Sequence, residues 1–183
     1  KPVSREARNS WILETAKEYH IDVVPSFDSP AHMDYITWKF EQNYKANPSY
    51  SFTYDGTTYK ASDVKGCIYY TRPVNASAPQ WQYTTMDLNN NVSKAFVLNI
   101  YSDIADFFKE YSGSTKFSIG ADEVNLDDYG GYTVNWEYSD FPIYINQLNR
   151  MLNAKGYTCR MFNDFIGCTS NGTAANPKYG FDE

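Results

Sequence analysis

The sequence lacks the features of several common functional classes. It has no cluster of lysine and arginine, and its 183 residues have a net charge of −6, so nucleic acids and anionic membrane surfaces are poor candidate partners. No apolar run approaches the length of a membrane span. No glycine-rich phosphate loop follows a predicted strand, and no G-x-S-x-G motif offers a nucleophilic serine. Nucleotide binding and serine-based hydrolysis are therefore disfavoured.

Metal-binding and disulfide patterns are missing as well. The two histidines, His20 and His32, have no H-E-x-x-H or H-x-H spacing, and we predict neither a metal ion nor a cofactor. Three cysteines cannot all pair internally, and none belongs to a C-x-x-C motif. A disulfide between Cys159 and Cys168 is one interpretation, and reduced structural thiols are the simpler one.

Apolar and aromatic residues are abundant. Apolar residues make up 42% of the chain, which is enough for a packed core, and we predict one domain over residues 1–183. Aromatic residues reach 17%. Their simplest role is to fill the core, and the functional alternative is a surface that stacks on sugar rings.

Hydrophobic periodicity predicts helices that alternate with strands. In chain order we predict a helix from 4 to 19, a strand 21–27, a helix 91–111, a strand 116–120, a helix from 140 that Gly156 ends, and a strand 157–163. Ser4 and Asp140 are the expected N-caps of the first and third helices. The apolar face expected for the first helix consists of Trp11, Ile12, Thr15, Ala16 and Tyr19.

Residues 33–86 interrupt this alternation and form a long loop excursion within the domain. Tyrosine, asparagine, serine, threonine and proline dominate this segment. Asp55-Gly56, flanked by alternating residues, predicts a β-hairpin. Long loops in compact domains are usually functional, and the sequence leaves the role of this one open.

The element order indicates an α/β fold with a parallel sheet. Two architectures fit, an open doubly wound sheet and a (β/α)8 barrel. A complete barrel requires about 250 residues, so three strands would form only the middle of one.

Polar residues follow all three predicted strands. Since functional side chains of parallel α/β folds gather where strands end, these are the candidate site residues. They are Ser26, Asp28 and His32 after the first strand, Asp122 and Glu123 after the second, and Asn163 and Asp164 after the third.

The adjacent acids Asp122 and Glu123 are the most informative of these residues. Neighbouring side chains on a strand point to opposite faces, so two such acids share a pocket only where the strand ends. A solvated strand end is the simple alternative. The small residues Gly120 and Ala121 let other groups approach closely, which favours a site. A tandem pair suggests that one acid protonates a leaving oxygen while the other orients a group of the substrate.

The motifs SIGADEV and IDVVPSFDSPAHM resemble the fourth-strand and third-strand signatures of glycoside hydrolase family 20, the β-N-acetylhexosaminidases and lacto-N-biosidases. MDLNNN and RMFND resemble the path between those strands and the fifth strand of that family. The resemblance implies a partial (β/α)8 TIM barrel, from about helix 2 to strand 5, with a long insertion after strand 3. The family cleaves terminal β-linked N-acetylhexosamine by a retaining mechanism in which the 2-acetamido group of the substrate is the nucleophile.

The resemblance also implies a role for each site residue. Glu123 resembles the general acid/base, Asp122 the residue that orients the acetamido group, and His32 the histidine that supports the acid/base. By the same resemblance, Asp28, Phe162 and Asp164 are substrate-binding residues.

The chain departs from the family signatures at four positions. Ser26 stands where glutamate is usual, Ala31 and Ala121 stand where glycines are usual, and Phe162 stands where many relatives have tryptophan. We expect Ala121 to have ordinary backbone angles, and Phe162 to keep an aromatic wall without an indole donor.

The family's residues from the remaining barrel strands have no counterpart here, so we expect a fragment that is inactive alone and can self-associate through open sheet edges. Its substrate would be a glycan, and its location extracellular or on a cell surface, in a bacterium. A lacto-N-biosidase that releases a disaccharide is the close alternative. A non-catalytic carbohydrate-binding or structural barrel domain is the alternative of another class.

Overall fold

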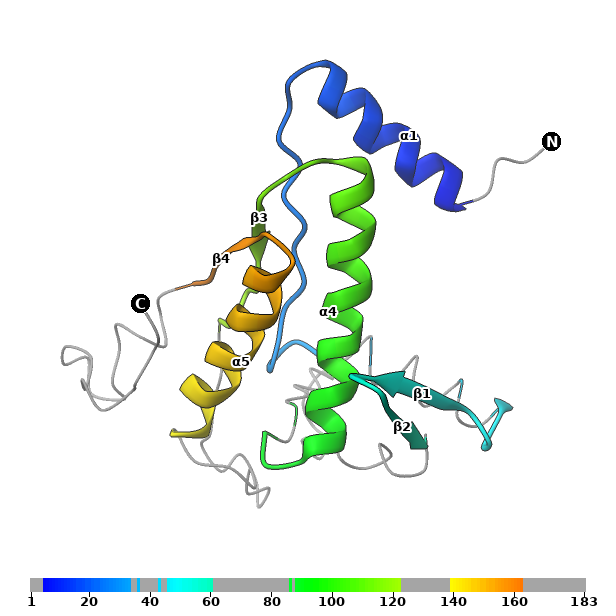
Figure 1. The fold of residues 1–183 in the computed structure, drawn as a ribbon, viewed down its shortest axis with the longest axis vertical. Coiled ribbons are helices and arrows are strands. Elements are labelled where there is room, and N and C mark those ends of the chain that lie inside the picture. Colours follow the sequence, from blue (N-terminus) through cyan, green and yellow to red (C-terminus); the bar gives the residue numbers. More distant parts are fainter. Residues whose placement is uncertain are drawn as a thin grey trace, which may run out of the picture.

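The structure, a computed structural model, describes part of the chain: residues 5–33, 36, 43, 46–60, 86, 88–122 and 139–162. The helices and strands within it are α1 (Arg5–Glu18), β1 (Ser51–Tyr54), β2 (Thr57–Lys60), α4 (Asn91–Tyr111), β3 (Lys116–Ser118), α5 (Asp140–Ala154) and β4 (Thr158–Arg160), shown in Figure 1. No helix in these residues is both long and apolar enough to cross a membrane.

The three predicted strands lie side by side in the predicted order and run parallel. β3 pairs with β4, with Lys116 opposite Thr158 and Ser118 opposite Arg160. On the other edge of β3, Ser118 forms a parallel bridge with Ser26. The α/β class predicted from the sequence is therefore confirmed. The first strand is shorter than predicted, because only this single bridge joins the 21–27 segment to its neighbour.

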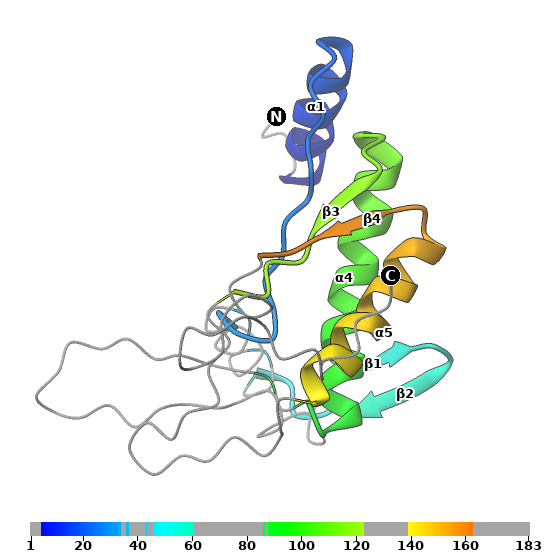
Figure 2. The same cartoon turned by 90° about the vertical axis from the view of Figure 1, so that its left-hand side faces the viewer.

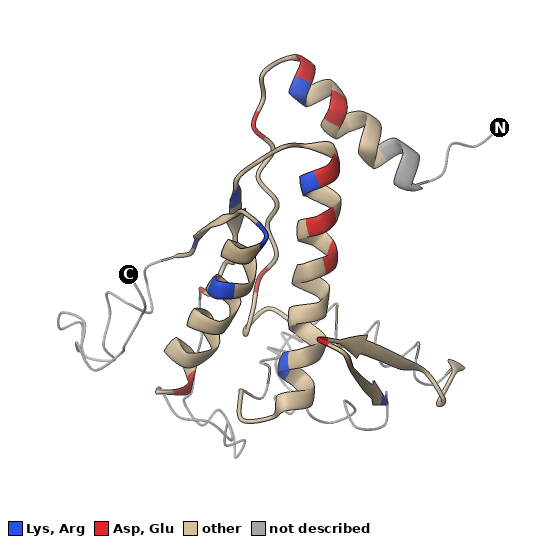
Figure 3. Ribbon diagram, in the orientation of Figure 1, with Lys and Arg blue, Asp and Glu red and all other residues tan. Residues whose placement is uncertain are grey.

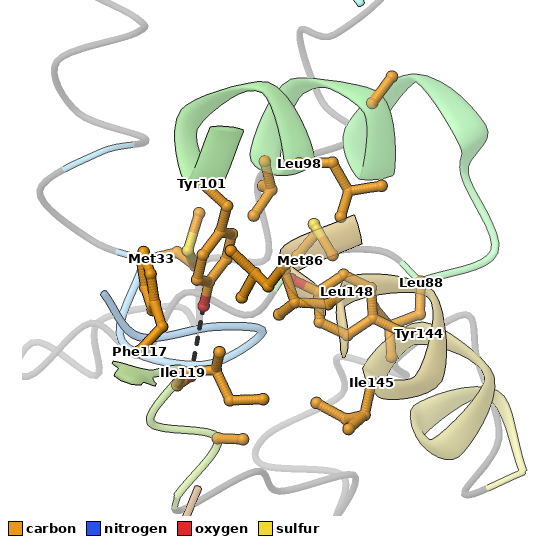
Figure 4. Close-up of a cluster of buried hydrophobic side chains, with 14 of the residues drawn as sticks. Met33, Met86, Leu88, Leu98, Tyr101, Phe117, Ile119, Tyr144, Ile145 and Leu148 are labelled. Atoms are coloured by element: carbon orange, nitrogen blue, oxygen red, sulfur yellow. Dashed lines mark hydrogen bonds between the residues drawn. The ribbon is translucent and has the colours of Figure 1, made fainter. Parts of the chain in front are cut away.

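Helices α4 and α5 pack against the strands and against each other (Figure 2). The predicted bounds of α4 are confirmed, and the Asn90 side chain caps its first turn by accepting hydrogen bonds from the Val92 and Ser93 amides. Aromatic and aliphatic side chains from both helices and β3 form the core (Figure 4). Its largest fully buried members are Tyr101, Tyr144, Phe117, Phe141, Met33, Met86, Leu98, Ile119, Leu148 and Leu152.

The N-cap of helix α5 lies one position earlier than predicted. Ser139 occupies the N-cap position and Asp140 is the first helical residue, so the cap predicted at Asp140 is wrong by one residue. An acid in the first turn still interacts favourably with the helix dipole. Gly156 follows the helix with φ +90°, as a helix stop requires.

The predicted hairpin in the excursion is confirmed. β1 and β2 are antiparallel, and the turn residues Asp55 and Gly56 both have positive φ, at 47° and 72°. Phe52 anchors the hairpin on Phe96 of α4, with ring centroids 5.4 Å apart. Most of the excursion lies outside the described residues.

The apolar face predicted for α1 is wrong. Trp11, Ile12 and Tyr19 are 65%, 54% and 73% exposed, whereas Leu13 is 5% exposed. The helix itself has nearly the predicted bounds, although Ser4 lies outside the described residues. Periodicity showed that this face is apolar but could not show what packs against it.

Ion pairs lie at the end of the sheet where the strands begin. Lys116 of β3 donates to Asp22 at 3.1 Å, and Lys155, after α5, donates to Asp106 of α4 at 2.6 Å. Figure 3 shows the charged residues of α4 concentrated toward its C-terminal half, which faces this end of the strands. The predicted site residues lie at the opposite end.

Candidate active site

Three of the predicted site residues meet where the strands end. Asp28 and His32 come from the segment after the Ser26 bridge, and Asp122 follows β3. His32 Nε2 lies 3.9 Å from Asp122 Oδ2. One polar atom from each of the three side chains lies within 4.8 Å of the others. The strand-end rule therefore selected residues that are distant in sequence and close in space.

The backbone after β3 holds Asp28 in place. The Ala121 amide donates a hydrogen bond of 2.8 Å to Asp28 Oδ1. Gly120 packs so tightly against Asp28 that a Cβ at position 120 would lie 2.9 Å from Asp28 Cβ and still closer to its carboxyl group. The close approach predicted from the small residues of SIGA is thus found, and only glycine permits it.

The expectation of ordinary backbone angles at Ala121 is wrong. Ala121 has φ +64°, and Gly120 before it has φ +63°. Two consecutive left-handed residues turn the chain sharply after Ile119, which aims the Ala121 amide at Asp28. In this conformation the alanine Cβ clashes with the backbone, and glycine, which has no Cβ, avoids the clash.

Burial raises the pKa of Asp28 to about 6, because removal from water disfavours the charged carboxylate. The neighbouring Asp122 carboxylate contributes to this rise. The Ala121 amide and the His32 imidazole oppose the rise. Asp28 therefore exchanges a proton near neutral pH, whereas a solvated aspartate does so near pH 4.

Asp122 and His32 are only partly covered, with side chains 29% and 32% exposed. One oxygen of Asp122, Oδ1, is buried and accepts no hydrogen bond within the part of the chain that the structure describes. A buried acceptor without a donor costs free energy. The exposed part of the Asp122 side chain lies outside this oxygen, so a ligand would approach the carboxyl group from its other side.

The other predicted site residues are placed less completely. Glu123 and Asp164 lie outside the described residues, as does Asn163. Phe162 is 58% exposed, and its backbone amide donates to the Gly120 carbonyl at 2.9 Å, so its backbone lies beside the end of β3. The chain also places Cys159 in β4 as a free, half-buried thiol whose pKa burial raises to about 11.

The grouping of Asp28, His32 and Asp122 has the composition of a small metal site. Such groupings also occur without any ion, and nothing in the coordination of the described residues selects one. We therefore assign no metal to the cluster.

Sequence reasoning missed three buried hydroxyl groups, those of Ser29, Tyr101 and Tyr144, which are bonded to one another next to Asp28. Ser29 Oγ lies 2.8 Å from Tyr101 Oη and 2.6 Å from Tyr144 Oη. Tyr101 lies on the buried face of α4 among apolar residues. A tyrosine on the inner face of a helix requires a hydrogen-bond partner, and this was the available signal.

Comparison with known proteins identifies a family and similar folds. The sequence model described as "Glycosyl hydrolase family 20, catalytic domain" matches residues 5–170. Among solved structures, Dispersin B is 26% identical with a TM-score of 0.57, and the match covers 95% of this chain. A catalytic module of StrH, a pneumococcal exo-β-D-N-acetylglucosaminidase, is 24% identical with a TM-score of 0.62 over 100% of this chain.

The chain spans well under half the length of these proteins. It covers 41% of the Dispersin B chain and 38% of the StrH chain. A family 20 β-N-acetylglucosaminidase matches at 12% identity and a TM-score of 0.50, with 28% of its length covered. Because StrH is 24% and this third protein 12% identical to the chain, their matches show a shared fold alone.

Proposed function

The chain belongs to glycosyl hydrolase family 20, and from this we propose that it forms part of the catalytic (β/α)8 barrel of an enzyme that removes terminal β-linked N-acetylhexosamine from glycans. The observation that supports this most is the convergence of Asp28, His32 and Asp122 at the carboxyl ends of parallel strands. In barrel enzymes this end of the strands is where the active site is built.

The proposed reaction uses the substrate's own amide. The 2-acetamido oxygen attacks the anomeric carbon and the glycosidic bond breaks, while Glu123 gives its proton to the leaving oxygen. Water then adds to the anomeric carbon of the oxazolinium intermediate, Glu123 takes up the proton from that water, and the acetamido group is restored. The configuration at the anomeric carbon is retained after these two steps.

Asp122 is suited to the group that becomes positively charged. Its side chain is 29% exposed, so the carboxylate can accept the N–H of the acetamido group from its exposed side. Positive charge develops on this group as the oxazolinium ring forms, and a carboxylate fixed beside it stabilises that charge. His32, whose Nε2 lies 3.9 Å from Oδ2 of Asp122, is proposed to support the acid/base Glu123.

The test compares two variants of the full-length protein that contains this chain. An aryl β-N-acetylglucosaminide and an aryl lacto-N-bioside are offered as substrates. Glu123→Gln should lower kcat by about 10²- to 10⁴-fold, as expected for loss of a general acid, and retain ligand binding. The matched control is Glu110→Gln, an exposed glutamate at the far end of α4, which should keep kcat.

The same assay separates the alternatives. Turnover of the aryl lacto-N-bioside alone would identify a lacto-N-biosidase. Turnover of neither substrate would reject the hydrolase and leave a carbohydrate-binding or structural domain. An aryl β-glucoside, which has no acetamido group, should not be cleaved, and its efficient cleavage would contradict the substrate-assisted route.

We further propose that residues 1–183 in isolation are inactive. The chain covers 41% or less of the solved relatives described above, so a comparable enzyme has additional strands that line the pocket. Turnover by the isolated chain, measured beside the full-length protein, would contradict this.

A further inference from the structure

Three buried hydroxyl groups connect helices α4 and α5 to the loop that carries Asp28. Tyr101 comes from α4, Tyr144 from α5, and Ser29 directly follows Asp28. All three residues are almost completely buried, with exposed fractions of 0% for Ser29 and Tyr101 and 1% for Tyr144. Figure 4 shows Tyr101 and Tyr144 projecting from the two helices into the shared core.

The direction of these hydrogen bonds is fixed by counting protons. Tyr101 Oη donates to the Phe27 carbonyl at 2.8 Å, with the Ile119 carbonyl also near at 3.3 Å. A tyrosine has one hydroxyl proton, so Ser29 must donate in the 2.8 Å bond to Tyr101. Ser29 has then used its own proton, so Tyr144 must donate in the 2.6 Å bond to Ser29. The donors run in one direction, from Tyr144 through Ser29 and Tyr101 to the backbone.

The two carbonyl groups near Tyr101 Oη lie in the two segments that carry Asp28 and Asp122. Phe27 immediately precedes Asp28, and Ile119 precedes the Gly120–Ala121 turn whose amide binds Asp28. Tyr101 therefore holds the backbone of one strand end to the backbone of the next. Ser29 holds Asp28 from its other side.

We propose that Tyr101, Ser29 and Tyr144 are positioning residues that keep the Asp28 carboxyl group seated on the Ala121 amide and thereby fix Asp122 relative to Asp28. In its catalytic consequence, the inference rests on the proposed hydrolase function. None of the three hydroxyls touches substrate in this arrangement. Their effect on the reaction passes through the backbone that carries the two aspartates.

The chain offers a matched comparison for a purely structural role. Tyr157 is also buried, at 2% exposure, and its hydroxyl also donates to a backbone carbonyl, that of Ala105, at 2.7 Å. This bond lies toward the end of the sheet where the strands begin. Replacing either tyrosine by phenylalanine removes one hydroxyl and keeps the ring contacts, such as those of Tyr101 with Phe27 and Phe117.

The experiment measures hydrogen–deuterium exchange and steady-state kinetics in Tyr101→Phe, Tyr144→Phe and Tyr157→Phe variants of the full-length protein. We expect Tyr101→Phe to speed exchange around Ala121 about tenfold, the effect of losing one buried hydrogen bond. Tyr157→Phe should speed exchange around Ala105 and leave Ala121 unchanged. Tyr144→Phe should have a smaller effect at Ala121, because the bonds from Ser29 onward remain.

The kinetic expectation follows the same order. Tyr101→Phe should lower kcat about tenfold with KM within about twofold, since a misplaced catalytic group slows the reaction more than it weakens binding. Tyr157→Phe should keep kcat at temperatures where it is folded. Equal effects of Tyr101→Phe and Tyr157→Phe on Ala121 exchange would overturn the proposal.

Two outcomes need a second measurement. If Tyr101→Phe does not fold, the contrast between Tyr144→Phe and Tyr157→Phe at Ala121 decides by the same criterion, and equal exchange there overturns the proposal. If the full-length protein cleaves no N-acetylhexosaminide, the hydrolase function fails, and the exchange measurements alone still decide whether the hydroxyls position Asp28.

Discussion

The acidic residues at the two ends of the parallel strands have opposite surroundings. Where the strands begin, Asp22 pairs with Lys116 at 3.1 Å and Asp106 pairs with Lys155 at 2.6 Å. Where they end, Asp28 and Asp122 lie together with the imidazole of His32. Hydrogen bonds from Ser114 and Lys116 lower the pKa of Asp22, whereas burial raises that of Asp28 to about 6. The acids at one end are paired with lysines, whereas the acids at the other end lie together beside a histidine.

The largest expected effect comes from removing a charge at each end in turn. Asp122→Asn in the full-length protein should lower kcat/KM by about 10²- to 10³-fold, because the neutral amide cannot stabilise the developing positive charge. Asp22→Asn removes the same charge from the other end and should change kcat/KM by less than about twofold, since an exposed ion pair contributes little. Similar losses in the two variants would show that the comparison between the ends has no catalytic meaning.

The two ends of β3 differ in the space left around their glycines. Gly113 before the strand has φ +71° and open surroundings, with Lys17 Nζ 3.7 Å from a Cβ built there. Gly120 after the strand has φ +63°, and Asp28 occupies the space where a Cβ of residue 120 would lie. Gly113→Ala should lower the free energy of unfolding by about 1 to 2 kcal/mol from backbone strain alone. Gly120→Ala adds a clash, and we expect a loss of about 3 kcal/mol or more.

Denaturant unfolding of both glycine variants checks this difference. Gly156→Ala is a further control, because it has φ +90° and nothing within 4 Å of the added Cβ. Equal destabilisation of Gly113→Ala and Gly120→Ala would mean that Asp28 does not occupy the space beside Gly120.

The two ends should also respond to pH with opposite sign. The pKa of Asp28 in the folded protein, about 6, exceeds its usual 3.8, so the folded state holds a proton that the unfolded state has lost. Its contribution to stability therefore falls as pH rises from about 4 to 6. Asp22 has a lowered pKa, so its contribution is present above its usual range and is lost as pH falls.

Asp28→Asn keeps an oxygen for the Ala121 amide and removes the ionisation. Its stability relative to the parent should increase by on the order of 1 to 2 kcal/mol between about pH 4 and 7, allowing for partial exposure of the site. Unfolding by denaturant at several pH values measures this difference. A difference that is constant across that pH range would show that Asp28 titrates like a solvated aspartate.

The smallest expected effect concerns the strained turn at Gly120 and Ala121, which follows β3. Ala121→Gly relieves the clash of an alanine at φ +64° and should raise the free energy of unfolding by about 0.5 to 1 kcal/mol. Ala105→Gly, in the middle of α4, should instead lower it by about 1 kcal/mol. Loss of stability in both variants would place Ala121 in ordinary backbone geometry.

The parts of the fold predicted from sequence are those that local patterns determine. The bounds of α4, the Asp55-Gly56 hairpin turn and the order of the parallel strands follow from periodicity, turn chemistry and connection rules. The exposed Trp11 and Tyr19 on α1 could not be predicted, because burial depends on what packs against a face. The positive φ of Ala121 depends on Asp28, whose contact with that turn is tertiary.

The site was predicted in part for a similar reason. The rule that functional residues follow strand ends selected Asp28, His32 and Asp122, which lie together although Asp122 is far from the other two in sequence. The hydroxyl bonds of Tyr101 and Tyr144 were not predicted, because both residues belong to helix faces that are apolar by composition. Their role depends on Ser29, which no local pattern links to either helix. The roles predicted for Glu123 and Asp164 remain predictions.

The order in which these parts assemble follows from the pairing of the strands. The Ser118–Arg160 pair closes a chain segment that contains only α5 as a described helix, whereas the Ser26–Ser118 bridge closes the much longer segment that contains the excursion and α4. Closing a longer loop costs more entropy and slows folding. We therefore expect β3, α5 and β4 to form a nucleus first, and Asp28 to reach Gly120 late. The cluster would then exist only in molecules that have completed folding.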